Sequence, residues 1–325
     1  MSARVSVIVP LYNKAAYIGR CLDSVLSQTF RDLEVIVVND GSTDGGEQLV
    51  RRCPDSRVRL VTQPNAGPGA ARNRGVSEAS APIVAMLDGD DAWEPEYVER
   101  SLRCLEDPVA CVTWGMLEYP MRESTGPRWA KIGIPEGRYR VTAQTPPRLL
   151  AGIVSNMLPS STVIRKEVFQ SLGGFYANNR CLFAEDAYLW IKVLLRHEAA
   201  FHAEPLVRRF CDASELSMNL DGPRPIEPFL VDTGDLRAGC PPELRPLLRK
   251  FLAIRACKTA SVYGYFGRSA QARALVRDFV SWHDWDAPFF PLALAGCTPI
   301  GKWLGYLARA TGVNLRERTG RGAGR

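Results

Sequence analysis

The first 120 residues alternate short, unbroken apolar runs with stretches of mixed polarity. The runs are rich in β-branched residues, and they occupy positions 5–10, 33–38, 58–62, 82–88 and 109–114. Continuous apolar runs of this length are typical of strands buried on both faces of a sheet. We therefore predict a buried strand at each of these positions.

Amphipathic helices are predicted between the strands. Apolar residues between 18 and 26 recur at helical spacing, and those between 98 and 105 do so after Pro95, which we place in the first helical turn. Strands that alternate with helices indicate an α/β fold with a mainly parallel central sheet. Ligands bind such sheets at the carboxyl ends of the strands.

The pattern is less regular after residue 120. Five prolines between 120 and 150 predict a long functional loop or insertion. Residues 160–175 then indicate a strand and a helix that ends at Gly173 and Gly174, and residues 185–197 indicate a further helix.

These patterns divide the chain into four parts. Residues 1–215 are expected to form an α/β domain, with a first half at 1–115 and a second half at 116–215. A proline-rich link at 216–246 leads to a helical region at 247–312. Residues 313–325 are expected to be a basic, disordered tail.

Composition narrows the classes of partner. The 325 residues carry a formal net charge of +6 and are 46% hydrophobic. The last 14 residues hold four arginines and one glutamate, a net +3 and therefore half of the excess. Because positive and negative charges nearly balance in the rest of the chain, we do not expect nucleic-acid binding.

Cysteine usage and hydropathy predict a cytoplasmic protein. The nine cysteines form no CxxC pair and are odd in number, so we expect reduced thiols. The first residues contain no apolar core of a signal peptide, and the uncharged run at 287–301 is too short to span a bilayer. Aromatic residues are mixed with Lys302 and Arg309 over 287–310, so two alternatives stay open: packing on the domain, or peripheral contact with the inner face of a membrane.

The sequence "AMLDGDDAW" at 85–93 places Asp88, Asp90 and Asp91 directly after a predicted strand. A polar turn is one explanation, because Asp and Gly tolerate unusual backbone angles. The position at a strand end favours another, namely a hard divalent cation that relieves the repulsion between the carboxylates. A cation with few protein ligands keeps positions open for substrate phosphates.

Other predicted strand ends are also polar. "PLYN" follows the first strand, "NDGSTDG" the second and "QPNAGPGAARNRG" the third. Asp40 could accept a hydrogen bond from a base or ribose, and Arg72 could pair with a phosphate. Helix capping is the alternative for Asp44 and Asn65. The convergence of these loops on one sheet edge favours a binding site over separate caps.

These segments in order resemble the motifs of the inverting family-2 glycosyltransferases. The resemblance rests on "VSVIVPLYNKAAYIGRCLDSVLSQTF", "VIVVNDGSTDG", "NAGPGAARNRG" and "AMLDGDDAWEPEY" over about residues 4–105. "PSSTVIRKEVFQSLGGF" and "FAEDAYLWIKV" resemble the acceptor half of the same family. The resemblance implies a GT-A fold, a Rossmann-like α/β sandwich that binds a nucleotide-sugar.

The resemblance also implies roles for individual residues. Asp40 would hold the base of the nucleotide, Asp88 would face its ribose, and Asp186 of the Glu185-Asp186 pair would be the catalytic base. Asp88 and Asp90 form the Asp-x-Asp motif. Asp90, with Asp88, would hold Mn²⁺ or Mg²⁺, and the adjoining Asp91 would bind either the metal or the acceptor. The other positions expected to line the nucleotide-sugar are Pro10, Tyr12, Asn13, Ser42, Asn65, Gly67, Arg72 and Gly89.

One position departs from the family pattern. Asp212 stands where family members often have a histidine that completes the metal site. Aspartate can also bind a hard metal, so a metal ligand and a solvated turn residue remain equal alternatives. His202, ten residues earlier, is expected to lie in a strand.

The function that the resemblance implies is metal-dependent, inverting transfer of a hexosyl or N-acetylhexosaminyl group. The expected donor is a UDP-sugar, and the acceptor is a hydroxyl of a glycan, a lipid-linked molecule or a small molecule, in cell-surface glycan or polysaccharide synthesis. The alternatives are a non-catalytic nucleotide-sugar-binding protein on the same fold and, with less support, a nucleotidyltransferase. "PLYNKAAY" is not the glycine-rich phosphate loop that nucleotidyltransferases usually have after the first strand, and no GxGxxG motif suggests a dehydrogenase.

Overall fold

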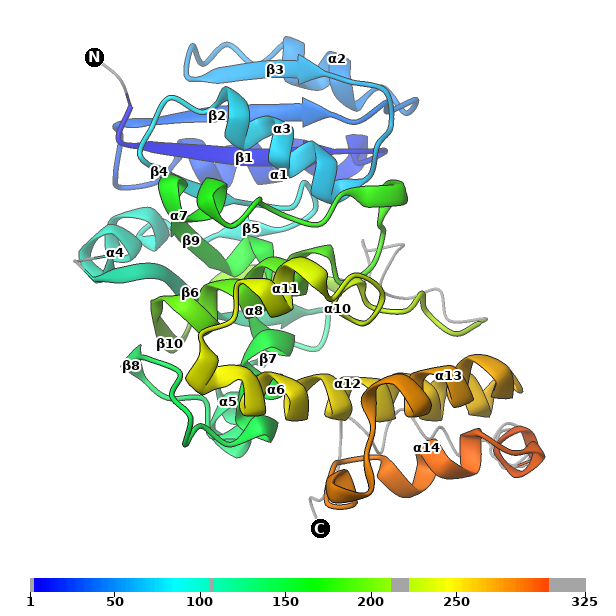
Figure 1. The fold of residues 1–325 in the computed structure, drawn as a ribbon. Helices are drawn as coiled ribbons and strands as arrows, with labels where there is room; N and C mark the ends of the chain where they lie inside the picture. Colours follow the sequence, from blue (N-terminus) through cyan, green and yellow to red (C-terminus); the bar gives the residue numbers. More distant parts are fainter. Residues whose placement is uncertain (1–2, 106–107, 212–221, 304–325) are drawn as a thin grey trace.

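The computed structural model describes residues 3–105, 108–211 and 222–303 (Figure 1). Over these residues one sheet of ten strands runs in the order β3-β2-β1-β4-β9-β6-β10-β5, with β7 beside β6 and β8 beside β10. The strands are β1 (Val5–Leu11), β2 (Leu33–Asn39), β3 (Val58–Thr62), β4 (Ile83–Met86), β5 (Ala92–Trp93), β6 (Val109–Tyr119), β7 (Glu123–Ser124), β8 (Gly137–Tyr139), β9 (Thr162–Arg165) and β10 (Glu198–Phe210).

Helices connect the strands of the first half and dominate the end of the chain. Those up to residue 196 are α1 (Ala15–Leu26), α2 (Gly46–Arg51), α3 (Pro68–Glu78), α4 (Tyr97–Cys104), α5 (Gly126–Ile132), α6 (Pro147–Asn156), α7 (Lys166–Ser171) and α8 (Glu185–Arg196). Those after residue 221 are α10 (Pro228–Val231), α11 (Gly234–Ala238), α12 (Arg245–Tyr265), α13 (Ser269–Phe279) and α14 (Phe290–Gly296).

The sheet is parallel through its first half and mixed beyond. β1 pairs in parallel with both β2 and β4, and β2 does so with β3. β9 enters antiparallel between β4 and β6, and β6 then pairs in parallel with β10 along ten registered positions. The predicted α/β fold is confirmed, and the unbroken apolar runs are explained because helices cover both faces.

Successive residues of β1 point into two different cores. Val7 and Val9 pack with the buried residues of α1, whereas Ile8 packs with Ala71 and Val76 of α3. The second core continues through α6 and α8 to α12. In Figure 1, α3 and α8 lie on the near side of the sheet, and α12 runs across the lower part of the molecule. The sheet therefore has one helical layer on each face.

Two expectations about local structure were wrong in detail. Pro95 precedes α4 and lies in the turn before its first residue, Tyr97. The proline-rich stretch at 120–150 is not a plain loop, because it contains β7, α5, β8 and the start of α6. The prolines at 127 and 147 stand in the first turns of α5 and α6, where a missing N–H has no cost.

The described part of the predicted link, residues 222–246, packs onto the rest of the chain. α10 contacts α8 and α12. Glu227, which is buried, accepts hydrogen bonds from Arg255 at 2.6 Å and from Thr259 at 2.7 Å. Within the described residues, none of the helices combines the length and the apolar character that crossing a bilayer requires.

Candidate functional site

The loops that follow β1 and β2 are tied together by polar side chains. Asn13 adopts a left-handed φ of 50°, and its Oδ1 accepts a hydrogen bond from the Thr43 amide at 2.9 Å. The Asn13 amide donates to Ser42 Oγ at 3.2 Å. Tyr12, the residue before Asn13, exposes 46% of its surface. This arrangement leaves an aromatic ring free at the sheet edge where we predicted the base of a nucleotide.

Asp40 organises the loop after β3. Its buried carboxylate accepts hydrogen bonds from Gln63 Nε2 at 2.8 Å, from the Ala66 amide at 2.8 Å and from the Gly67 amide at 2.9 Å. Gly67 has a φ of 92°, which a side chain would strain. Asp40 therefore fixes the glycine-rich segment in place. This structural role is separate from the contact with a nucleotide base that we predicted for Asp40.

Replacing Asp40 by Asn should loosen this loop. The amide NH₂ of Asn would face a backbone N–H, so at least one of the three hydrogen bonds is lost, at a cost of about 1–2 kcal/mol. We expect urea unfolding to show that loss and hydrogen exchange at Ala66 and Gly67 to accelerate. Asp23→Asn, which changes an exposed carboxylate on α1, is the control. Equal stability of the two variants would contradict the assigned role.

Arg72 of α3 joins the loop after β4 to the start of α8. Its guanidinium is buried, and it forms ion pairs with Asp88 Oδ1 at 2.5 Å and with Glu185 Oε1 at 2.9 Å. Burial opposes the charge of Arg72, but the two carboxylates outweigh it and raise the pKa of the guanidinium. α3 thus holds the acidic cluster after β4 and the start of α8 at the same cleft.

The three aspartates after β4 have different partners. Lys14 Nζ pairs with Asp90 Oδ2 at 2.8 Å, and the Phe210 amide donates to Asp91 Oδ1 at 3.2 Å. The Asp88 amide donates to Ser160 Oγ at 3.1 Å. Burial and the charge of Asp88 raise the pKa of Asp90, and burial with the charges of Asp88 and Asp90 raises the pKa of Asp91 to about 7. Burial and repulsion between the carboxylates therefore both disfavour the fully ionised cluster.

Glu185 and Asp186 open α8. Ala184, which precedes them, has a left-handed φ of 57°, and Asp186 Oδ1 accepts a hydrogen bond from the Ala187 amide at 2.8 Å. Burial and the charge of Glu185 raise the pKa of Asp186 to about 7, although Arg72 acts in the opposite direction. A carboxylate with a pKa near neutrality can accept a proton at physiological pH.

One cleft of about 360 Å³ brings much of the predicted site together. Six predicted residues line it: Arg72, Asp88, Asp90, Asp91, Glu185 and Asp186. Pro10, Tyr12, Asn13, Asp40, Ser42, Asn65, Gly67 and Gly89 lie in or beside the neighbouring strand ends and are not part of its lining. A Cβ on Gly89 would stand 3.2 Å from the Pro10 carbonyl, so these two positions touch. Asp212 lies outside the described residues.

The far wall of the cleft is basic and was not predicted. It contains Arg209, Arg224, Arg255 and Lys258. Burial and the charge of Arg255 lower the pKa of Lys258 to about 8. Their isolated positions after residue 205 form no sequence pattern. Arg209 lies in β10 and Arg224 before α10, whereas Arg255 and Lys258 lie in α12, which packs on α6 and α10.

Two further side chains at the site lie within recognised motifs but were not singled out. Lys14 follows "PLYN" and Ser160 stands in "PSST".

His202 lies in β10 as predicted, where its Nδ1 is 2.8 Å from Glu136 Oε1 and its ring stacks on Trp114. All nine cysteines are free thiols, as expected.

The acidic side of the cleft fits a divalent cation that a substrate helps to bind. The described residues contain no group of three or more histidine, cysteine, aspartate or glutamate side chains that could form a complete metal site. Asp88 and Asp90 nevertheless offer oxygen ligands, which Mg²⁺ and Mn²⁺ prefer. A cation there would also offset the burial and the mutual repulsion of the carboxylates, which together raise the pKa values of Asp90 and Asp91.

Solved structures show the same fold. The Staphylococcus aureus protein TarS, residues 1–349 in complex with UDP-GlcNAc, superposes with a TM-score of 0.69 over 96% of this chain and 92% of that chain, at 19% identity. The mannosyltransferase PcManGT of Pyrobaculum calidifontis, in complex with GDP-Man and Mn²⁺, gives a TM-score of 0.51 over 96% of this chain and 87% of that chain, at 22% identity. The predicted GT-A fold is therefore confirmed.

Sequence comparison gives the family. The glycosyltransferase GlyA of Streptococcus pneumoniae serotype 4 is 38% identical over 125 residues, which are 38% of this chain and 18% of GlyA. The chain thus spans less than a fifth of that relative's length. The model of the family described as "Glycosyl transferase family 2" matches residues 6–173, which is more than half of the chain. The chain therefore belongs to glycosyl transferase family 2, a family of transferase enzymes.

Proposed function

We propose that this protein transfers a sugar from a UDP-sugar to a hydroxyl acceptor, with inversion and with Mn²⁺ or Mg²⁺ bound at Asp88 and Asp90. The observation that carries the proposal is the position of Asp186. It lies in the same cleft as the Asp88–Asp90 pair, and Arg72 bridges the two sides through Asp88 and Glu185. A base opposite a phosphate-binding edge is what a single displacement at an anomeric carbon requires.

Each group of residues has a distinct part in this reaction. The strand-end loops held by Asp40 and Asn13 position the donor, and Asp186 takes the proton from the acceptor hydroxyl. A divalent cation at Asp88 and Asp90 would stabilise the negative charge on the departing diphosphate. Asp91 is held by β10 and supports the shape of the cleft. The solved structures of TarS with UDP-GlcNAc and of PcManGT with GDP-Man and Mn²⁺ support a nucleotide-sugar donor and a divalent cation.

The location and acceptor belong to the same proposal. We infer a cytoplasmic enzyme of glycan or polysaccharide synthesis whose acceptor enters over the basic wall of the cleft. A scaffold that only binds nucleotide-sugars would have no need for a carboxylate poised to accept a proton, so the position and raised pKa of Asp186 favour catalysis.

A donor panel tests the function. UDP-, GDP- and dTDP-sugars are each added with Mn²⁺ or with EDTA, and thermal shift and release of nucleoside diphosphate are measured. We expect one UDP-sugar to raise the Tm and to be hydrolysed slowly only with the metal, and NMR of a transferred product to show the inverted anomer. Metal-independent binding of every donor without turnover would contradict the proposal and favour the scaffold.

Transfer should be lost at acidic pH. Because Asp186 must be ionised to accept a proton, and its pKa is raised to about 7, kcat/KM should fall about tenfold for each pH unit below that value. The donor Kd, measured over the same range, separates this effect from weakened donor binding. A flat kcat/KM between pH 5 and 8 would exclude Asp186 as the base.

A further inference from the structure

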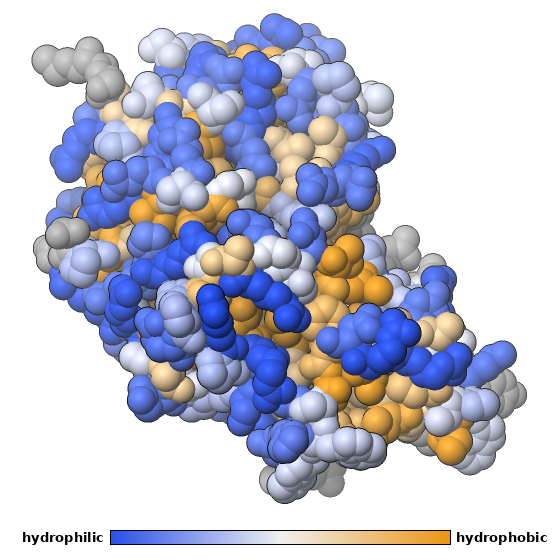
Figure 2. Space-filling view, in the orientation of Figure 1, coloured by the Kyte–Doolittle hydropathy of each residue, from blue (hydrophilic) through white to orange (hydrophobic). Residues whose placement is uncertain are grey.

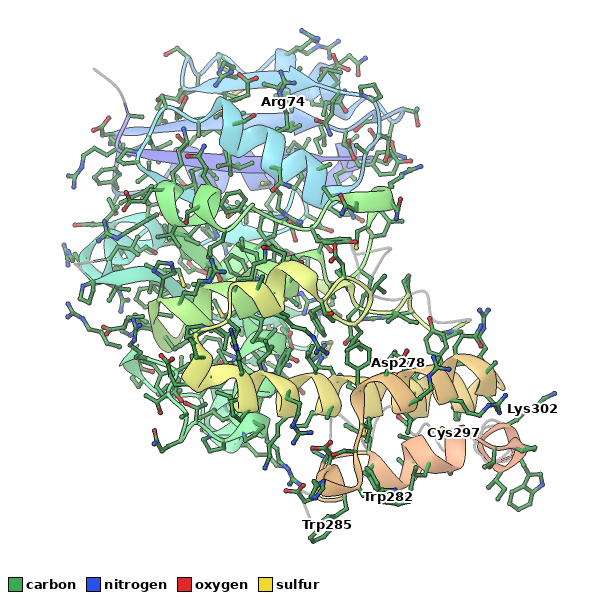
Figure 3. All side chains as sticks on the ribbon, viewed as in Figure 1. Arg74, Asp278, Trp282, Trp285, Cys297 and Lys302 are labelled. Atoms are coloured by element: carbon green, nitrogen blue, oxygen red, sulfur yellow. The ribbon has the colours of Figure 1, made fainter. Side chains whose placement is uncertain are left out.

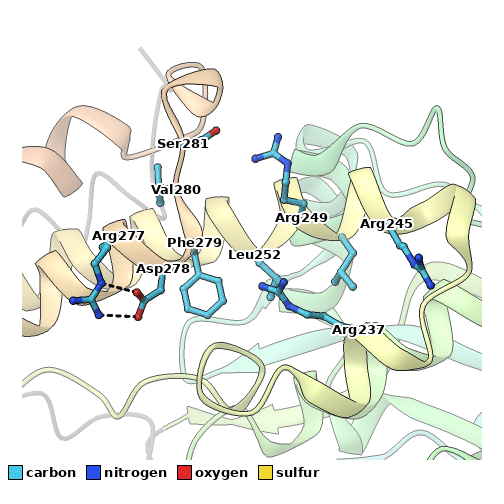
Figure 4. A pocket seen from close by; sticks show the side chains of 10 residues that line it. Arg237, Arg245, Arg249, Leu252, Arg277, Asp278, Phe279, Val280 and Ser281 are labelled. Carbon is cyan, nitrogen blue, oxygen red and sulfur yellow. Dashed lines mark hydrogen bonds and ion pairs between the residues drawn. The ribbon is translucent and has the colours of Figure 1, made fainter.

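A second cavity lies on the C-terminal helices, apart from the cleft. It is a groove of about 500 Å³ between α11, the first half of α12 and the end of α13 with the two residues after it (Figure 4). It shares no lining residue with the cleft that holds Asp186. The groove is lined by Arg237, Arg245, Leu248, Arg249, Leu252, Arg277, Asp278, Phe279, Val280 and Ser281.

The rim of the groove carries unneutralised positive charge. Four arginines and one aspartate line it, a net charge of +3. Arg277 pairs with Asp278 at 2.8 Å, and Arg249 pairs with Asp284 at 2.9 Å. Arg237 and Arg245 have no ion pair with a carboxylate in the part of the chain that the structure describes. Two guanidinium groups therefore remain to bind an anion, and guanidinium geometry matches phosphate well.

The interior of the groove is apolar. Leu248 and Leu252 of α12 form one side, and Phe279 and Val280 close the other. In Figure 4 the guanidinium of Arg237 extends from α11 towards Leu252 and Phe279. Figure 2 shows an apolar strip over α10 and α12 with hydrophilic side chains on both sides. A ligand that fits this groove has both an anionic group and an apolar part.

Exposed tryptophans follow the groove directly. Ser281 lines the groove, and Trp282 and Trp285 come next in the chain with 79% and 72% of their surfaces exposed. Figure 3 shows both at the outer edge of the molecule, at the end of α14 that lies nearer the groove. Asp284, which lies between them, is paired with Arg249 of the groove. Exposed indoles near arginine side chains are typical of proteins that sit in the interface of a membrane.

We propose that this groove binds the phosphate headgroup of an anionic membrane lipid, with Trp282 and Trp285 inserted beside it. The lipid phosphate would pair with Arg237 and Arg245, and the start of its acyl chains would contact Leu252 and Phe279. Residues 248–258 of α12 carry both this groove and the basic wall of the cleft. The proposed membrane contact lies on residues 237–285. For residues 287–310, the sequence alone does not decide between a membrane contact and packing on the domain.

Vesicle co-sedimentation of the full chain tests the groove. Phosphatidylglycerol vesicles are compared with phosphatidylcholine vesicles, for the wild type and for Arg237→Gln/Arg245→Gln. Each basic residue near an anionic surface contributes about fivefold, so the double variant should bind phosphatidylglycerol about thirtyfold more weakly. The matched control is Arg74→Gln/Arg103→Gln, which removes two exposed arginines paired on other helices. This control should bind like the wild type.

Two further measurements decide the source of the phosphate. Trp282→Ser/Trp285→Ser should weaken vesicle binding about tenfold or more. The thermal shift induced by the donor should stay unchanged in this variant, and that result would show that the domain is folded. Soluble 1-naphthyl phosphate is titrated as a second probe. Equal vesicle binding by the groove variant and its arginine control would overturn the proposal, and so would tight 1-naphthyl phosphate binding without any binding to vesicles.

Discussion

Asp186→Asn should lower the rate of sugar transfer about a thousandfold and leave donor binding within about threefold of the wild type, because general-base catalysis contributes about 10²–10⁴-fold. Asn keeps the size of the side chain, and its carbonyl oxygen can still accept the hydrogen bond from the Ala187 amide. It cannot take a proton from the acceptor hydroxyl. Single-turnover transfer and calorimetric titration of the donor measure the two quantities separately.

The control for this prediction is Glu204→Gln. Glu204 is an exposed acid that pairs with Arg100 on the surface, so its loss removes the same charge away from the cleft. Its transfer rate should match that of the wild type. If Asp186→Asn transferred sugar at the wild-type rate, Asp186 would not be the base, whereas a parallel loss of donor binding would point to a structural role.

Arg72→Met should destabilise the fold by about 3 kcal/mol and abolish donor binding. The substitution keeps the apolar volume but leaves Glu185, which is largely buried, and Asp88 without their cation. Removing one partner of a buried ion pair costs about 3–5 kcal/mol, and the partial exposure of Asp88 places the effect at the lower end. Urea unfolding with and without donor is the measurement.

Arg74→Met provides the matched control on the same helix. Arg74 is half-exposed and pairs with Glu78 one turn away, so its loss should change stability by less than about 0.5 kcal/mol. Equal stability of the Arg72 and Arg74 variants would show that the Asp88–Arg72–Glu185 bridge does not stabilise the contact between the loop after β4 and α8. Retained donor binding in a folded Arg72→Met protein would remove Arg72 from the nucleotide site.

The sequence predicted the first half of the fold well because its signals are local. The five apolar runs correspond to β1, β2, β3, β4 and β6, and the helical spacing at 18–26 lies within α1. Residues 120–150 were predicted less well. There the prolines at 127 and 147 stand in the first turns of helices. The sequence alone does not distinguish these helix starts from a loop, because α5 is held by its packing on α6 and β10.

By itself, the sequence determined the family, the α/β fold and the identity of the acids at the strand ends. Hydrophobic periodicity and ordered motifs are properties of contiguous residues, so they can be read without coordinates. Only the tertiary structure decided how Arg72 and Asp186, more than a hundred positions apart, share one cleft, and how α12 adds Arg255 and Lys258 to it. The arginine groove likewise joins α11, α12 and the end of α13. Such sites depend on helix packing, which brings together side chains that no local pattern connects.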